Sequence, residues 1–230
     1  MEFLLGSLAS ALILIFDFDS SVFVVVWTSI RISLIAVILA SLFSVPMGLL
    51  VALSTFPGKP LLLQTLNTLV ALPTVVVGLL LYGILSRQGP MGELGLLYTP
   101  TAMIIGQCVL IIPVIWSLSI SAALSADPRL LMTCRGLGAN TIQQGLLFLN
   151  EVRFLIMAAV VMGFGRAIGE VGIAMMLGGN IEGFTRTMTT AIALETSKGE
   201  FEFALALGIL LLLVAFVING LLQRFQYLNK

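Results

Sequence analysis

The strongest constraint on this chain is a series of apolar runs that are too long for the core of a small soluble domain. The run from Leu61 to Leu85 contains no charged residue, and the runs within 22–53, 99–124, 154–177 and 203–222 contain at most two each. A helix needs about 20 apolar residues to cross a bilayer. Because backbone groups in lipid must be hydrogen-bonded internally, we expect an all-α integral membrane protein with about five transmembrane helices.

The start of the chain differs from these runs. Its apolar part, from Phe3 to Phe16, is short for a span, and the chain begins Met1-Glu2 without the basic residues of a signal peptide. A short N-terminal interfacial helix is favoured, with a short sixth span as the alternative. The expected organisation is an N-terminal interfacial segment at 1–21, followed by one transmembrane domain at 22–230.

The composition argues against several functions. The formal net charge is zero, which gives no basis for binding nucleic acid, and the chain has no histidine to act as a general base or metal ligand. Cys108 and Cys134 form no metal-binding motif, so we expect no metal site and no catalytic residues. The chain also lacks a GxxxxGK[ST] phosphate loop, so if its activity is ATP-driven, ATP and Mg must be bound by another chain.

The distribution of basic residues predicts the orientation. With the polar loop at 125–153 placed in the cytoplasm, six of the 11 basic residues lie on the cytoplasmic side: Lys59, Arg129, Arg135, Arg153, Arg224 and Lys230. Three lie on the opposite side, namely Arg87, Arg186 and Lys198, and Arg31 and Arg166 fall within or near spans. The positive-inside rule therefore places this loop and the C-terminus in the cytoplasm.

The loop has the sequence features of two short helices. Asp127 can cap the first helix with Pro128 at its first position, and Gly138 suits a left-handed C-cap. Asn140 or Thr141 can cap a second helix through "IQQGLLFLNEV". The pattern predicts a rigid knob that docks on a soluble partner, or a helical hairpin packed on the protein's own surface.

The knob resembles the cytoplasmic coupling motif of bacterial ABC importer permeases. Gly138 matches the family glycine, whereas Leu131 and Cys134 stand where the family often has glutamate and alanine, and Asn150-Glu151 stand where it often has Leu-Pro. The resemblance implies an ATPase-coupling role for Asp127, Arg129, Leu131, Cys134, Arg135, Gly136, Leu137, Gly138 and Ala139.

The resemblance covers roughly 22–223. "LPTVVVGLLLYGILSRQGPMG" and "GFGRAIGEVGIAMMLGGNI" are similar to the molybdate and tungstate branch of these permeases, and "YTPTAMIIGQ" and "GFTRTMTTAIALETSKGEFE" to its tungstate-uptake members. It implies the type I ABC importer permease architecture. It also implies a homodimer in a prokaryotic cytoplasmic (inner) membrane, with two cytoplasmic ATPase subunits and an extracytoplasmic oxyanion-binding protein.

The resemblance makes tungstate the expected substrate, with molybdate, sulfate or another oxyanion as the alternative. A secondary transporter working alone is less favoured, because the sequence shows no convincing internal repeat. A membrane-embedded enzyme is also less favoured, because the residues for catalysis are missing.

Charged residues within the fourth apolar run are candidates for the translocation path. Arg166 and Glu170 are four residues apart, which predicts a shared helical face, and Gly169 lies between them. They could line the path or its gate, or form a structural ion pair. Four glycines nearby predict close helix packing: Gly163, Gly165, Gly169 and Gly172.

The polar segment after this run is a candidate outer vestibule. Arg186, Thr187, Thr189 and Thr190 could donate hydrogen bonds to an oxyanion, or could serve only in packing. Four acids in the same segment suit docking of a binding protein that carries basic groups: Glu182, Glu195, Glu200 and Glu202.

Overall fold

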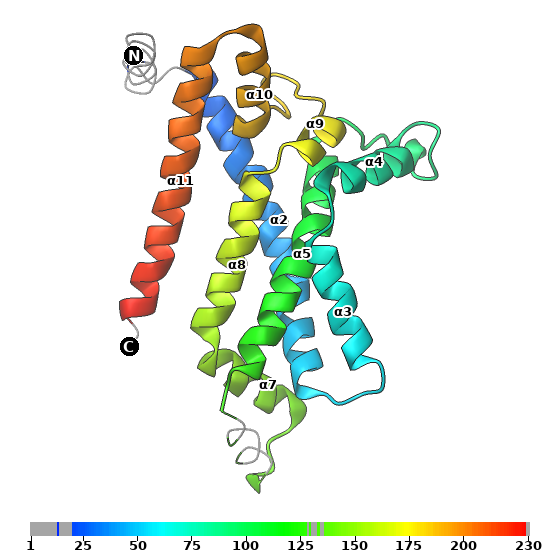
Figure 1. Cartoon of the computed structure of the whole chain (residues 1–230), viewed down its shortest axis with the longest axis vertical. Helices are drawn as coiled ribbons and strands as arrows, with labels where there is room; N and C mark the ends of the chain where they lie inside the picture. Colours follow the sequence, from blue (N-terminus) through cyan, green and yellow to red (C-terminus); the bar gives the residue numbers. More distant parts are fainter. Residues whose placement is uncertain (1–12, 14–19, 128, 130–132, 134–135, 229–230) are drawn as a thin grey trace.

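A computed structural model describes residues 13, 20–127, 129, 133 and 136–228. All regular elements in this part of the chain are helical, which confirms the all-α prediction (Figure 1). The helices are α2 (Ser20–Leu53), α3 (Lys59–Val70), α4 (Thr74–Leu85), η1 (Gly92–Leu94), α5 (Pro100–Leu124), α7 (Thr141–Glu151), α8 (Arg153–Ile168), α9 (Gly172–Gly178), α10 (Met188–Lys198) and α11 (Phe201–Leu228). The interfacial helix predicted within 1–21 lies almost entirely outside the described residues.

Three of these helices, α2, α5 and α11, are long and apolar enough to cross a membrane. Two bent pairs of helices meet the same test together: α3 with α4, and the residues of α7 from Ile142 with α8. If each pair is one span, the described residues hold up to five spans. Five is thus the largest number of spans that the described helices allow, and it counts α7, which the sequence places in the polar loop, as part of a span. The predicted number of about five spans stays a prediction.

The predicted second span, Leu61–Leu85, is a sharply bent pair of helices. α3 ends at Val70, α4 begins at Thr74, and the two axes are bent by 95°. Pro73 lies at the bend as the N-cap of α4, and its carbonyl accepts hydrogen bonds from the Val76 and Val77 amides. Proline has no amide hydrogen and disfavours a helical conformation in the preceding residue, so α3 cannot continue through it.

The predicted fourth span, Phe154–Leu177, is also interrupted. α8 ends at Ile168, and α9 is a separate helix of seven residues that begins at Gly172. Arg166 therefore lies in the last turn of α8, and Glu170 lies in the connection beyond it. The expectation that these two side chains share one continuous helical face was wrong.

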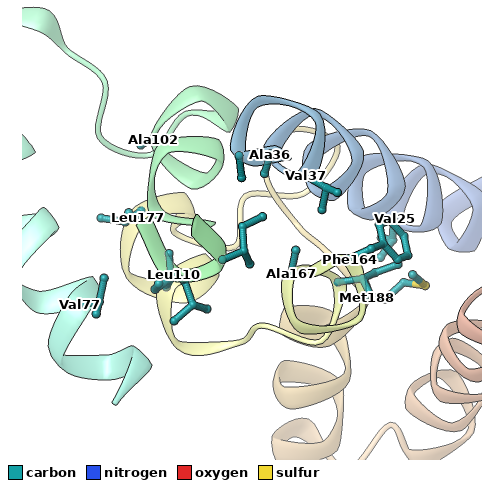
Figure 2. Packing of buried hydrophobic residues seen from close by; sticks show 14 of the residues in the cluster. Val25, Ala36, Val37, Val77, Ala102, Leu110, Phe164, Ala167, Leu177 and Met188 are labelled. Atoms are coloured by element: carbon teal, nitrogen blue, oxygen red, sulfur yellow. The ribbon is translucent and has the colours of Figure 1, made fainter. Parts of the chain in front are cut away.

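The buried core joins helices that are far apart in the sequence. α2 packs mainly on α5, and α5 also packs on α8 and α9. Figure 2 shows side chains from these helices converging with Val77 of α4 and Met188 of α10. The backbones approach closely where small residues replace large ones: a Cβ added at Gly48 of α2 would lie 2.6 Å from Cβ of Ser119 on α5. This core fixes the α8–α9 connection from several sides.

The two ends of the bundle carry different elements. In Figure 1, α10 lies at one end, α7 and the start of α3 lie at the other, and α11 runs from the α10 end toward it. Lys59 and Arg153 begin α3 and α8 at the α7 end. Glu195 of α10 and Glu200, just before α11, lie at the α10 end.

Candidate translocation site and coupling loop

The connection between α8 and α9 is held by a buried carboxylate. Glu170 is 7% exposed, and its Oε1 accepts a hydrogen bond from the Ile173 amide in the first turn of α9 at 3.0 Å. Its carbonyl oxygen accepts a hydrogen bond from the Thr189 hydroxyl on α10 at 2.8 Å. The Glu170 side chain thus caps α9 from the residue before the N-cap, Val171, and supplies an acceptor for a free amide of its first turn.

Gln107, which the sequence analysis missed, supports the other side of the same connection. This residue of α5 is 2% exposed, and its Nε2 donates a hydrogen bond to the Ala167 carbonyl in the last turn of α8 at 3.1 Å. The same carbonyl also accepts a hydrogen bond from the Glu170 amide at 3.3 Å, so side chain and backbone meet at the end of α8. The available signal was the one amide side chain within an uncharged, mostly apolar run, because a buried amide needs hydrogen-bond partners.

Arg166 forms no ion pair with Glu170 in the part of the chain that the structure describes. The side chain is half-buried, and its Nε is buried with no hydrogen-bond partner among the described residues. The structural ion pair considered from the sequence is therefore absent there. A positive charge in the last turn of a helix is favoured by the dipole, but no described carboxylate neutralises it.

The glycines of this region divide into packed and open positions. A Cβ added at Gly163 would lie 2.6 Å from Cδ1 of Ile115, so this glycine lets α8 approach α5 closely. Gly165, on the same helix, has no atom within 4 Å of such a Cβ in this single chain, and Gly169 is the C-cap of α8. The predicted packing role fits Gly163 but not Gly165 within one copy of the chain.

The threonines of the candidate vestibule are buried and hydrogen-bonded within the protein. Thr187 caps α10 and forms a capping box with Thr190, and the Thr187 and Thr189 hydroxyls lie 3.1 Å apart. Ser29 of α2 accepts a hydrogen bond from the Met188 amide at 2.7 Å. These contacts position α10 against α2 and against the α8–α9 connection.

Arg186 is neutralised by nearby carboxylates. It forms ion pairs with Glu182 at 3.3 Å and with Glu195 at 4.0 Å, and Glu195 also pairs with Lys198 at 3.0 Å. These four residues line a pocket of about 590 Å³ next to the start of α2. The pocket therefore has two basic groups balanced by acidic ones, unlike the surroundings of Arg166.

A pair of tyrosines, also missed from the sequence, lies where α4 approaches α9. Tyr98 has a φ of 63°, its amide donates to the Leu177 carbonyl at 2.8 Å, and its ring packs against Gly179. The hydroxyls of Tyr82 and Tyr98 lie 3.5 Å apart. The hydrogen bond with Tyr82 raises the pKa of the Tyr98 hydroxyl, and partial desolvation raises it further.

The loop predicted to couple to an ATPase contains the turns that the sequence predicts. Oδ1 of Asp127 accepts a hydrogen bond from the Arg129 amide at 2.9 Å, and Gly138 has a φ of 76°, which suits glycine at a helix C-terminus. Asn140 caps α7 in a capping box with Gln143. Leu131, Cys134 and Arg135 lie outside the described residues, whereas Gly136, Leu137 and Ala139 are described and lead into α7.

The helix α7 has one packed face and one exposed apolar face. Phe148 is 4% exposed and packs in a cluster with Leu49 of α2 and Ala122 of α5. In contrast, Ile142 is 73% exposed, Leu146 is 62% exposed, and Leu137 just before the helix is 82% exposed. The helix is therefore anchored to the bundle by one side and presents apolar side chains on the other.

The sequence is similar to permeases of known transporters over nearly its whole length. It is 38% identical over 226 residues to a protein named tungstate uptake system permease from Peptoclostridium acidaminophilum, covering 98% of this chain and 99% of that one. A protein of the same name from Campylobacter jejuni is 35% identical, with coverages of 98% and 95%. A probable anion ABC transporter permease from Haloferax volcanii is 39% identical over 203 residues, with coverages of 86% and 88%.

The chain belongs to the anion permease family of ABC transporters. The recognition made from the coupling loop and the fourth apolar run is thus confirmed. A more distant relative is the molybdenum transport system permease of Escherichia coli, 30% identical over 217 residues, with coverages of 86% and 93%. No protein-family model matches the chain.

A solved structure confirms the fold. The structure titled "Inward facing conformations of the MetNI methionine ABC transporter" matches with a TM-score of 0.72, covering 91% of this chain and 96% of that one. The sequences are 15% identical, so this similarity concerns the fold alone. The chain is an ABC importer permease subunit and, like its relatives, a non-catalytic membrane protein.

Proposed function

We propose that this permease forms the translocation path for tungstate in an ATP-driven importer. The assignment of tungstate as substrate rests on the 38% and 35% identity, over nearly whole chains, to permeases named for tungstate uptake. The molybdenum permease is less similar, at 30%. Molybdate is the second candidate because that relative also aligns over most of its length.

The proposed assembly contains two copies of this chain, two ATPase subunits that bind ATP and Mg, and an extracytoplasmic binding protein. The α7 end faces the cytoplasm of a prokaryotic inner membrane, together with the C-terminus. The exposed apolar face of α7 supports this arrangement, because it can insert into a groove of an ATPase subunit. The excess of basic residues at this end agrees with the positive-inside rule.

The proposed path passes the α8–α9 connection, at Arg166, Gly169 and Glu170. Tungstate carries two negative charges, and Arg166 supplies a positive charge that no described carboxylate pairs with. Glu170 is committed to capping α9, but its charge still limits how tightly the region holds an anion. Weak binding suits conduction, because an anion that binds tightly leaves slowly.

The α10 end is proposed as the docking surface for the binding protein. The acids that remain exposed there attract a basic surface, and the buried hydroxyls of Thr187, Thr189 and Thr190 fix α10 in place. Arg186 holds this surface together through its ion pairs. In this proposal the binding protein selects the anion and the permease admits it.

The deciding experiment measures cellular tungsten and molybdenum by elemental analysis, with both anions limiting and at equal concentration. Deleting the gene should remove tungsten uptake selectively, and the wild-type gene should restore it. Selective loss of molybdenum uptake would make molybdate the substrate in place of tungstate. Unchanged uptake of both metals would reject the proposal that the transporter imports these oxyanions.

The same assay tests the path. Arg166→Gln removes the unpaired charge and should lower tungsten uptake at least about tenfold. Unpaired charges within the membrane are costly, so they are expected to be kept for function. Arg87→Gln is the matched control, because it removes one exposed arginine outside the helices. Equal uptake by the two variants at equal expression would remove Arg166 from the path.

A further inference from the structure

A groove that the transport proposal does not use lies on the outside of the bundle near the α10 end. It has a volume of about 600 Å³ and lies between α2, the first turns of α5 and the loop at 183–184. Its walls include Trp27, Ile35, Ile104 and Phe184, and its polar groups include Arg31 and the hydroxyl-bearing Thr28 and Thr101. We call it the Arg31 groove.

Arg31 is the charged side chain of this groove, and it is exposed. In the part of the chain that the structure describes, it forms no ion pair and its side chain forms no hydrogen bond. The guanidinium group has five N–H donors and stays charged at any physiological pH. The groove therefore carries a positive charge that no described carboxylate pairs with, and it can accept a negatively charged group.

The level of the groove in the membrane can be read from α5. This helix has 25 residues, about 37 Å, which is more than the roughly 30 Å of hydrocarbon in a bilayer. Pro100 and Thr101, at the first turn of α5, share the groove with Arg31, so the guanidinium lies near the boundary of the membrane. Trp27 is 65% exposed one turn away, and exposed tryptophans are typical of that boundary.

We propose that the Arg31 groove binds an anionic phospholipid, with the lipid phosphate on Arg31 and an acyl chain along Ile35 and Ile104. A phosphate accepts hydrogen bonds from guanidinium in a bidentate arrangement, and the apolar walls suit a lipid chain. Near the boundary the guanidinium also reaches water, so the lipid is favoured by the phosphate contact and the apolar walls together. This inference rests on the membrane placement of the chain and not on which anion it transports.

The chemistry that Arg31 recognises, a tetrahedral oxyanion, is shared by a free anion, so the experiment separates the two sources. The assembled transporter is purified in detergent, and native mass spectrometry counts bound phosphatidylglycerol per permease over a concentration series. The wild type should hold phosphatidylglycerol more tightly than phosphatidylcholine. Millimolar tungstate or inorganic phosphate should not displace the lipid.

Arg31→Gln should weaken this binding at least fivefold, whereas Arg87→Gln, with the same loss of charge elsewhere, should leave it unchanged. Thr101→Trp is a second variant, which keeps Arg31 but fills the groove from an exposed position, and it should also weaken binding. Gel filtration confirms that each variant assembles.

Three results would overturn the proposal. Binding that is equal in the wild type and Arg31→Gln would remove Arg31 from the site. Displacement of the lipid by tungstate or phosphate would assign the groove to a free anion. A wild type that binds no phosphatidylglycerol would mean that another surface, such as a second copy of the chain, covers the groove.

Discussion

The α8–α9 connection and the helix α7 differ in where their key side chains lie and in what these side chains contact. At the connection, Glu170 and Gln107 are buried, and each forms a hydrogen bond to a helix end. On α7, Ile142 and Leu146 are apolar and largely exposed. Buried polar groups with partners stabilise one arrangement, whereas exposed apolar groups gain only when another surface covers them.

This difference separates what the chain completes by itself from what it leaves to other subunits. The connection receives its support from α5 and α10 of the same chain, through Gln107 and Thr189. The exposed face of α7 has no such support, although the opposite face is anchored through Phe148. Variants at the two places should therefore affect different quantities: stability at the first, and coupling at the second.

The largest effect is expected on the exposed face of α7. The double substitution Ile142→Asp with Leu146→Asp places two charges where an apolar contact is proposed, so ATP-dependent uptake should fall by roughly tenfold or more. The thermal stability of the permease should stay close to that of the wild type, because both side chains are exposed. Uptake and co-purification of the ATPase subunit are the measurements.

Phe148→Asp is the matched contrast on the buried face of the same helix. It places a charge in the cluster with Leu49 and Ala122, so it should reduce the amount of folded permease and not only its coupling. If the double substitution also lowers stability, or leaves uptake and co-purification intact, the exposed face of α7 is not a docking surface.

The sequence predicted those features that depend on local chemistry. Long apolar runs located α2, α5 and α11, and Asp127, Gly138 and Asn140 marked the turns of the coupling loop because capping and left-handed backbone use few residue types. The positions of the two bends were less accessible. An apolar run has the same composition whether it is straight or broken, so Leu61–Leu85 was read as one span.

The candidate site depended on contacts between distant segments, which local patterns do not contain. Four-residue spacing suggested an Arg166–Glu170 pair, but the break after Ile168 leaves Glu170 to cap α9. Gln107 reaches this break from 60 residues away in sequence. Its partner, the Ala167 carbonyl, also accepts a hydrogen bond from the Glu170 amide at 3.3 Å, in the last turn of α8. The end of α8 was not predicted, so neither contact was.

Glu170→Ala should have the next largest effect, now on stability. It removes the acceptor for the Ile173 amide and leaves this donor buried, at an expected cost of about 2–3 kcal/mol in unfolding free energy. Glu170→Gln keeps an oxygen at the same place and should recover most of the loss. Thermal unfolding in detergent measures the stability of both variants. Equal losses of stability would show that the negative charge of Glu170 matters, and not the hydrogen bond that its oxygen accepts.

The glycines of α8 provide a smaller and sharper test of packing. Gly163→Ala forces a Cβ against Ile115 and should cost about 1–2 kcal/mol in stability. Gly165→Ala has open space around the added carbon in this single chain and should change the stability of the permease little. A large loss for Gly165→Ala, measured as permease dimer on gel filtration, would place this glycine against a second copy.

The smallest expected effect is a difference in stability between variants of two capping boxes, one exposed and one buried. Asn140→Ala, at the exposed start of α7, should cost about 1 kcal/mol, confined to the first turn of that helix. Thr187→Ala, at the buried start of α10, also removes a partner of the Thr189 and Thr190 hydroxyls and should cost more. Hydrogen exchange at the amides of each first turn measures both. Because water can replace the lost acceptor only at the exposed box, equal protection losses would mean that burial does not decide how much a cap contributes here.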